Sequence, residues 1–144
     1  LPVVDAMAKA LAADDLAAFN EASEPAMDVT GAMVESLRSP EGTIKTLDDL
    51  DASRHFHGFA DIHSARIAFH QFTLAAVAVL EPLRLAEGAP EFDLWECTMV
   101  DQSIPGAPKR GSWIQVPGRE GQNPFFGAEM LNCAQEIRRG TPKP

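Results

Sequence analysis

Apolar residues recur at every third or fourth position along the first 88 residues, which is the spacing of one face of an α-helix. The clearest stripe begins behind Asp61, an acidic residue suited to cap a helix, and runs through Phe69 to Leu83. Pro25 is expected to kink or break another stripe. The segments predicted to be helical are Val4–Leu11 behind Pro2, Leu16–Glu24, Met27–Leu37, Leu47–Phe56 and Ile62–Leu83.

The pattern changes near Gly88. Beyond this point the chain is rich in proline and glycine and contains both tryptophans and both cysteines. Short apolar runs between turn residues favour extended segments, and a turn at Asn123-Pro124 precedes a final apolar segment. We therefore predict extended segments at Glu91–Val100 and Ser112–Val116, a turn region at Pro105–Pro108, a short helix at about Phe126–Arg138 and a tail at 140–144.

These elements predict a mainly α fold in one domain, residues 1–144. Helical segments with one apolar face each, joined by short loops, most readily pack as a small antiparallel bundle, here residues 1–88. Residues 89–139 are expected to form a loop-rich arm with a short β-hairpin and a final short helix. A chain of 144 residues can bury one core but not two independent ones.

Composition narrows the classes of function. Hydrophobic residues make up 45% of the chain and charged residues 23%, as in ordinary globular domains. The net charge of -9 disfavours a nucleic-acid partner, because a phosphate backbone would be repelled. No apolar run is long enough to predict insertion into a membrane. Because the first residue is Leu1 rather than Met, we expect a processed, exported protein.

The two cysteines each stand close to a methionine. Cys97 and Met99 are two apart on a predicted extended segment, and Met130 and Cys133 are three apart on a predicted helix. Either spacing places both side chains on one face, so four sulfur atoms could converge. Thiolate and thioether ligands favour Cu(I) and, by the same softness, Ag(I), whereas methionine is a poor ligand for zinc. This pattern predicts a soft-metal site at these four residues.

The same residues allow a second interpretation. Met99 and Met130 can be ordinary core residues that fill gaps, while Cys97 and Cys133 form a disulfide that fastens the C-terminal segment. The two states exclude each other at any moment, because a disulfide has no thiolate for a metal. Residue types leave both alternatives open.

Histidines and tryptophans provide additional candidates. His63 and His70 flank the apolar stripe about two helical turns apart, roughly 10 Å, so at most one imidazole would join the sulfur atoms. Trp95 and Trp113 lie on the predicted extended segments, where an indole could shield a bound cation. The alternative roles are histidines without a ligand and tryptophans that cover the joint between arm and bundle.

No enzyme is expected, because the sequence contains no nucleophile elbow, zinc-protease motif, P-loop or dinucleotide glycine fingerprint. The paired carboxylates at Asp14 and Asp15, and at Asp48 and Asp49, stand where helix starts favour negative charge. We interpret these four residues as helix caps.

Several motifs together resemble an uncharacterised bacterial envelope domain that occurs alone or appended to copper/silver efflux membrane-fusion adaptors. The sequence departs from that family in two places: Thr98 stands where the family has proline in Cys-Pro-Met, and Ala134 stands where a glycine follows the last cysteine. The motifs that carry the resemblance are Ala10–Asp15, Asp61–Arg66 with Phe69, Cys97–Met99, Gly111–Gln115, Asn123–Gly127 and Met130–Cys133.

The resemblance implies a periplasmic or otherwise extracytoplasmic location and a link to heavy-metal handling. We therefore expect an extracytoplasmic binding protein for Cu(I) or Ag(I), with an efflux adaptor or another envelope protein as partner. The alternative is a structural or interaction module of the cell envelope, without a metal, that is stapled by a Cys97–Cys133 disulfide.

Overall fold

The computed structural model describes residues 1–40, 42 and 44–140, and in this part the chain adopts an α+β fold. The prediction of a mainly α bundle is wrong, because three strands form one antiparallel sheet that packs on the helices. The elements are α1 (Pro2–Ala12), α2 (Leu16–Ser23), α3 (Ala26–Leu37), α4 (Lys45–Ser53), α5 (Ile62–Leu83), β1 (Asp93–Cys97), α6 (Val100–Ser103), β2 (Gly111–Gln115), the 3-10 turn η1 (Gly127–Met130) and β3 (Gln135–Arg138).

The helices follow the apolar periodicity closely. Asp61 caps α5 by accepting a hydrogen bond from the Ser64 N–H at 2.8 Å, and Asp15 caps α2 in the same way. Pro25 stands between α2 and α3, as expected of a residue that cannot continue the hydrogen bonds of the first helix. The five predicted helices are therefore present, with ends shifted by a few residues.

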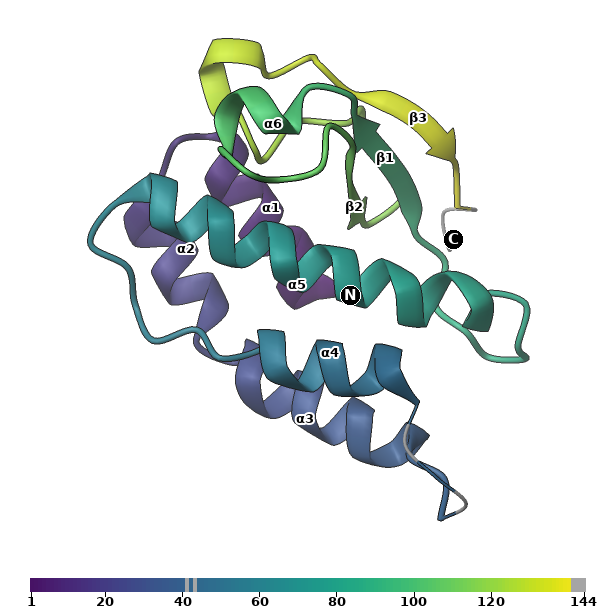
Figure 1. Ribbon diagram of the computed structural model, residues 1–144. Coiled ribbons are helices and arrows are strands. Elements are labelled where there is room, and N and C mark those ends of the chain that lie inside the picture. Colours follow the sequence, from purple (N-terminus) through teal and green to yellow (C-terminus); the bar gives the residue numbers. More distant parts are fainter. Residues whose placement is uncertain (41, 43, 141–144) are drawn as a thin grey trace.

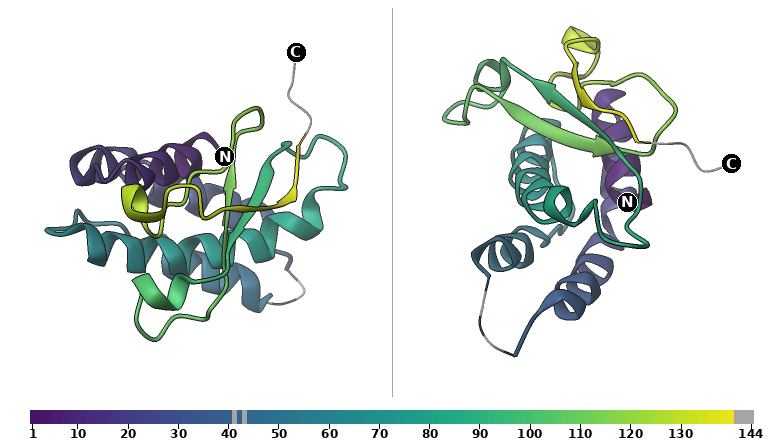
Figure 2. Two further views of the ribbon diagram at one scale, coloured as in Figure 1. Left: turned by 90° about the horizontal axis from the view of Figure 1, so that it is seen from above. Right: turned by 90° about the vertical axis from the view of Figure 1, so that its right-hand side faces the viewer.

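Helix α5 is the centre of the molecule. Figure 1 shows α5 running between the sheet on one side and the pair α3 and α4 on the other, and the right-hand view of Figure 2 shows the same order of layers. Helix α1 lies beside α5 and also contacts β2. The sheet therefore rests on α1 and α5 rather than projecting as an arm.

The sheet has the order β2-β1-β3, so β1 is its central strand. Antiparallel pairing places Trp95 opposite Trp113 and Cys97 opposite Gly111. On its other edge β1 pairs with β3, with an irregularity between Leu94 and Trp95. The two predicted extended segments are confirmed as β1 and β2, although both are shorter or shifted, and α6 follows directly after β1.

The predicted final helix at Phe126–Arg138 is wrong. Only the four residues of η1 turn helically, and the chain then extends as β3. Gly127 has a φ of 63°, a left-handed conformation that interrupts a right-handed helix. The free edge of β1 supplies hydrogen-bond partners that a local helix would leave unused, so tertiary pairing overrides local helix propensity.

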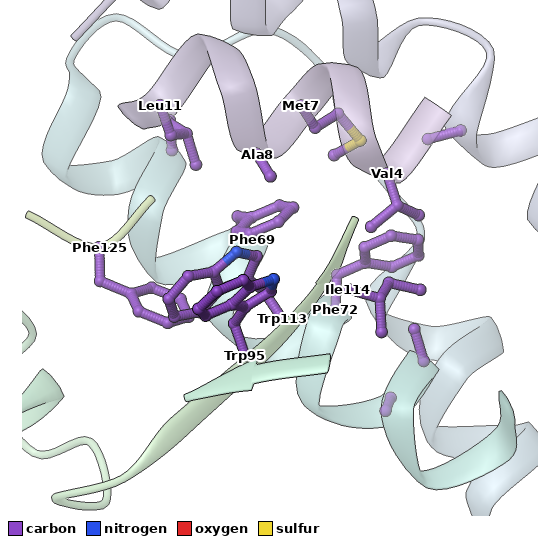
Figure 3. Close-up of a cluster of buried hydrophobic side chains, with 14 of the residues drawn as sticks. Val4, Met7, Ala8, Leu11, Phe69, Phe72, Trp95, Trp113, Ile114 and Phe125 are labelled. Carbon is purple, nitrogen blue, oxygen red and sulfur yellow. The ribbon is translucent and has the colours of Figure 1, made fainter. Parts of the chain in front are cut away.

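Aromatic side chains from the two halves of the molecule, the helical part (1–88) and the part that carries the sheet (89–140), share one core. Figure 3 shows Val4, Met7 and Leu11 of α1 facing a group of rings from α5, the sheet and the 116–126 segment. Phe125 links the halves, since its ring lies 6.4 Å from that of Phe69 and 5.8 Å from that of Trp113. The helices and the sheet therefore form one hydrophobic unit.

A polar clamp also joins the halves. Arg66, which is buried in α5, donates from Nε to the Pro124 carbonyl at 3.0 Å and from Nη2 to the Leu11 carbonyl at 2.9 Å. The same Nη2 forms an ion pair with Asp14 at 2.5 Å, and the other oxygen of Asp14 accepts from the Ala128 N–H. We call these five residues the Arg66 clamp. Asp14 therefore acts in a long-range contact, whereas Asp15 beside it is the helix cap.

Burial alone would raise the pKa of Asp14, but the hydrogen bond from Ala128 and the Arg66 guanidinium outweigh that effect and lower the pKa.

Of the predicted tail, 141–144 lie outside the described residues, while the Gly140 N–H donates to Asp93 at 2.8 Å. No helix in the part of the chain that the structure describes is long and apolar enough to cross a membrane.

Candidate metal-binding site

The two cysteines meet although they come from distant segments. Cys97 is the last residue of β1, and Cys133 lies in the turn that leads into β3. Their sulfur atoms are 3.8 Å apart, and both cysteines are free thiols. Cys97 is fully buried, whereas Cys133 is half-buried. The sequence-based prediction that these two residues lie together is thus consistent with this contact.

Asn123 holds the turn that carries Cys133. It is fully buried, and its side-chain amide donates to the Cys133 carbonyl at 2.8 Å while its carbonyl oxygen accepts from the Phe125 N–H. The Asn123 N–H in turn donates to the Leu131 carbonyl. A buried amide with this many partners fixes the backbone on both sides of the turn. Asn123 therefore holds the backbone of Cys133 in place.

The surroundings of the Cys133 thiol raise its pKa and so favour the protonated form. Burial raises the pKa of Cys133, and its contact with Cys97 raises it further. A backbone hydrogen bond from Thr98 acts in the opposite direction by favouring the thiolate. A metal ion that binds here must displace this proton, so affinity would weaken as the pH falls.

The two methionines do not share a regular element with their cysteines. Strand β1 ends at Cys97, so Met99 lies beyond it as the N-cap residue of α6. Met130 ends η1, and the Cys133 N–H donates to its carbonyl in a tight turn rather than within a helix. The strand and helix spacings that predicted convergence therefore do not apply. Both methionine side chains are half-buried and pack against the hydrophobic core.

The two candidate histidines differ in surroundings. His63, in the first turn of α5, is exposed. His70 is 5% exposed, its ring lies 5.4 Å from that of Phe125, and its Nε2 has no hydrogen-bond partner. Burial lowers the pKa of His70, which favours the neutral imidazole. The two candidate histidines thus lie in different environments despite sharing a helix.

The tryptophans belong to the interior of the sheet. Trp95 and Trp113 are cross-strand neighbours, and both are buried. The guanidinium carbon of Arg139 lies 4.8 Å from the Trp95 ring centroid, and the Trp113 Nε1 donates to Gln115 at 3.3 Å. These contacts match the structural role that the sequence left open, in which the indoles cover the joint between the halves.

The dithiol geometry fits a shared ion. With a metal–sulfur distance of about 2.3 Å, two thiolates on one ion lie about 3.8 Å apart at a tetrahedral angle and about 4.6 Å apart on opposite sides. Among residues 1–40, 42 and 44–140, no three His, Cys, Asp or Glu side chains form a ready-made cluster. The 3.8 Å separation matches the tetrahedral angle, and a soft ion such as Cu(I) can complete its ligands with thioethers, which zinc does not favour.

Two residues of this region have roles that the sequence did not reveal. Asn123 was interpreted only as part of a turn before Pro124, although asparagine before a turn commonly bonds to nearby backbone. Gly111 is opposite Cys97 and has an ordinary strand conformation, so only crowding by neighbours explains its lack of a side chain. No local pattern signals such a contact.

Searches against family models, curated proteins and solved structures give no match for this chain. The resemblance to the efflux-associated envelope domain thus rests on the motifs named above.

Proposed function

We propose that this protein binds a soft monovalent metal ion, Cu(I) or Ag(I), between Cys97 and Cys133 and takes part in extracytoplasmic heavy-metal handling. The observation that carries the proposal is the 3.8 Å separation of two free thiols, one at the end of β1 and one in the turn before β3. Sulfur ligands select Cu(I) over hard cations such as calcium and magnesium. The ion is the cargo of the protein, and Met99 and Met130 are the proposed thioether ligands.

The partial exposure of the site supports transfer of the ion. Cys97 is buried, and Cys133 is half-buried, so an ion between them would be shielded on one side and approachable on the other. A donor or acceptor protein could then exchange thiolate ligands through Cys133. The proposed partner is an efflux adaptor or another envelope protein, as the sequence motifs imply.

A Cu(I) titration of the reduced protein against a competing chromophoric chelator tests the proposal. Wild type is expected to take up one ion, and the Cys97→Ser/Cys133→Ser double variant is expected to lose high-affinity binding. Met99→Leu/Met130→Leu examines the thioethers, with Met27→Leu/Met33→Leu on α3 as its matched control. Equal affinity of wild type and the double serine variant would contradict the proposal.

The same contact supports a second function, that of an envelope interaction module stapled by a disulfide. Oxidation would shorten the sulfur separation from 3.8 Å to about 2.05 Å and tie β1 to the turn before β3. Alkylation of freshly isolated, metal-free protein followed by mass spectrometry separates the two functions. Two alkylated cysteines favour metal binding, whereas an unreactive pair that becomes reactive after reduction favours the staple.

A further inference from the structure

The buried imidazole of His70 lies on the same side of the sheet as Cys97. A side chain added at Gly111 would place its Cβ 3.1 Å from the His70 Nε2. Gly111 is directly opposite Cys97 in the antiparallel register, and the Cβ positions of such a pair point to the same face, about 4.5–5.5 Å apart. The His70 ring therefore lies beside the cross-strand neighbour of Cys97.

Gly111 leaves room for this approach. Its φ is not positive, so the backbone conformation would accept any residue. A Cβ at this position would instead meet Val100 at 2.8 Å as well as the imidazole. With glycine present, no side chain of residue 111 lies between His70 and the Cys97 end of β1.

The His70 Nε2 is also a ligand atom without a partner. It is buried, and no hydrogen-bond partner faces it, whereas buried polar atoms are nearly always paired. Imidazole nitrogen and thiolate sulfur are both ligands that copper accepts. The ring therefore offers an unused lone pair beside Gly111, the cross-strand neighbour of Cys97, whose sulfur contacts that of Cys133.

We infer that His70 Nε2 is a ligand of the ion bound by Cys97 and Cys133, in place of one of the thioethers of Met99 and Met130. This inference rests on the proposed function, and it selects His70 over the exposed His63 of the same helix. The described residues do not form a preassembled three-ligand cluster, so the imidazole and the thiols must approach one another as the ion binds. Gly111 keeps its own position free of a side chain for that movement.

Nuclear magnetic resonance of the reduced, ¹⁵N- and ¹³C-labelled protein titrated with Ag(I) tests this ligand directly. The His70 Nε2 resonance is expected to shift together with the Cβ resonances of Cys97 and Cys133. If the cysteine resonances shift and Nε2 does not, His70 is not a ligand and the proposed function stands. If none of them shifts, the proposed function itself fails.

Matched variants measure the size of the effect. His70→Gln is expected to lower the affinity for Ag(I) at least about 10-fold. Loss of a residue that only supports a ligand already costs roughly 10- to 100-fold in metal affinity, so loss of a ligand should cost no less. His63→Gln is the control and should bind as wild type. Equal affinity of both variants and wild type would overturn the inference. The spectra of the wild-type protein decide the question even if His70→Gln folds poorly.

Discussion

Two polar junctions between the helices and the C-terminal part of the chain differ in how far their groups are satisfied. In the Arg66 clamp, the guanidinium donates to two carbonyl groups and to Asp14, which also accepts from the Ala128 N–H. At the other junction, two thiols contact only weakly and the nearby His70 Nε2 has no partner. A satisfied junction stabilises the fold, whereas an unsatisfied one retains capacity for a ligand. The comparison separates the structural site from the candidate binding site.

The largest expected effect comes from breaking the clamp. Arg66→Ala leaves the Pro124 carbonyl without its donor and Asp14 without its cation, whereas the Leu11 carbonyl still accepts from the Asp14 N–H. At about 1–3 kcal/mol for the carbonyl and about 1 kcal/mol for the partly exposed ion pair, we expect a loss of about 2–4 kcal/mol in the free energy of unfolding. Urea denaturation measures it. Arg84→Ala removes an arginine with an exposed Glu81 contact at the end of the same helix and should cost less than about 1 kcal/mol. Equal losses of stability in both variants would show that the Arg66 clamp stabilises the fold no more than a surface ion pair does.

A smaller loss of stability is expected at Asn123, which lies between the Arg66 clamp and the two cysteines. Asn123→Ala removes the hydrogen bonds to Cys133 and Phe125, which should cost about 1–3 kcal/mol and also free Cys133 to react faster with an alkylating reagent. Asn20 makes the same pair of bonds to Phe59, so Asn20→Ala is a matched control. That variant should lose stability with no change in the rate of Cys133 alkylation. If the rate is unchanged in Asn123→Ala as well, Asn123 does not position the thiol.

The sequence predicted those features that depend on local spacing. The helices and the Asp61 cap follow from apolar periodicity and from one side chain that bonds three residues ahead. Strand β3 was missed because its pairing with β1 depends on a distant strand, and 127–138 carries no alternation that marks a strand. With only two cysteines, their proximity was a natural prediction. The strand spacing assumed for Cys97 and Met99 does not hold because β1 ends at Cys97, and the helix spacing assumed for Met130 and Cys133 does not hold because η1 ends at Met130.

The smallest effect expected is a pH dependence at Asp14. Its pKa is lowered in the folded protein, so the unfolded chain binds the proton more readily and stability is lost as the pH falls from about 5 towards the folded pKa. Because the Asp14 side chain is 42% exposed, the contribution should stay below about 1 kcal/mol. Asp14→Asn should flatten this part of the stability profile between pH 7 and pH 3. If the profile of Asp14→Asn equals that of the wild type, the Asp14–Arg66 ion pair does not contribute to stability.

The central position of β1 has a consequence for synthesis. Because its two edge partners both come later in the chain, the strand leaves the ribosome before either neighbour exists. Cys97 emerges 36 residues ahead of Cys133, and in that interval it can gain its β2 neighbour but has no second thiol beside it. Only a nascent chain that extends past Cys133 can bring the second thiol to it, so a product that ends before residue 133 would carry helices α1 to α5 without the dithiol.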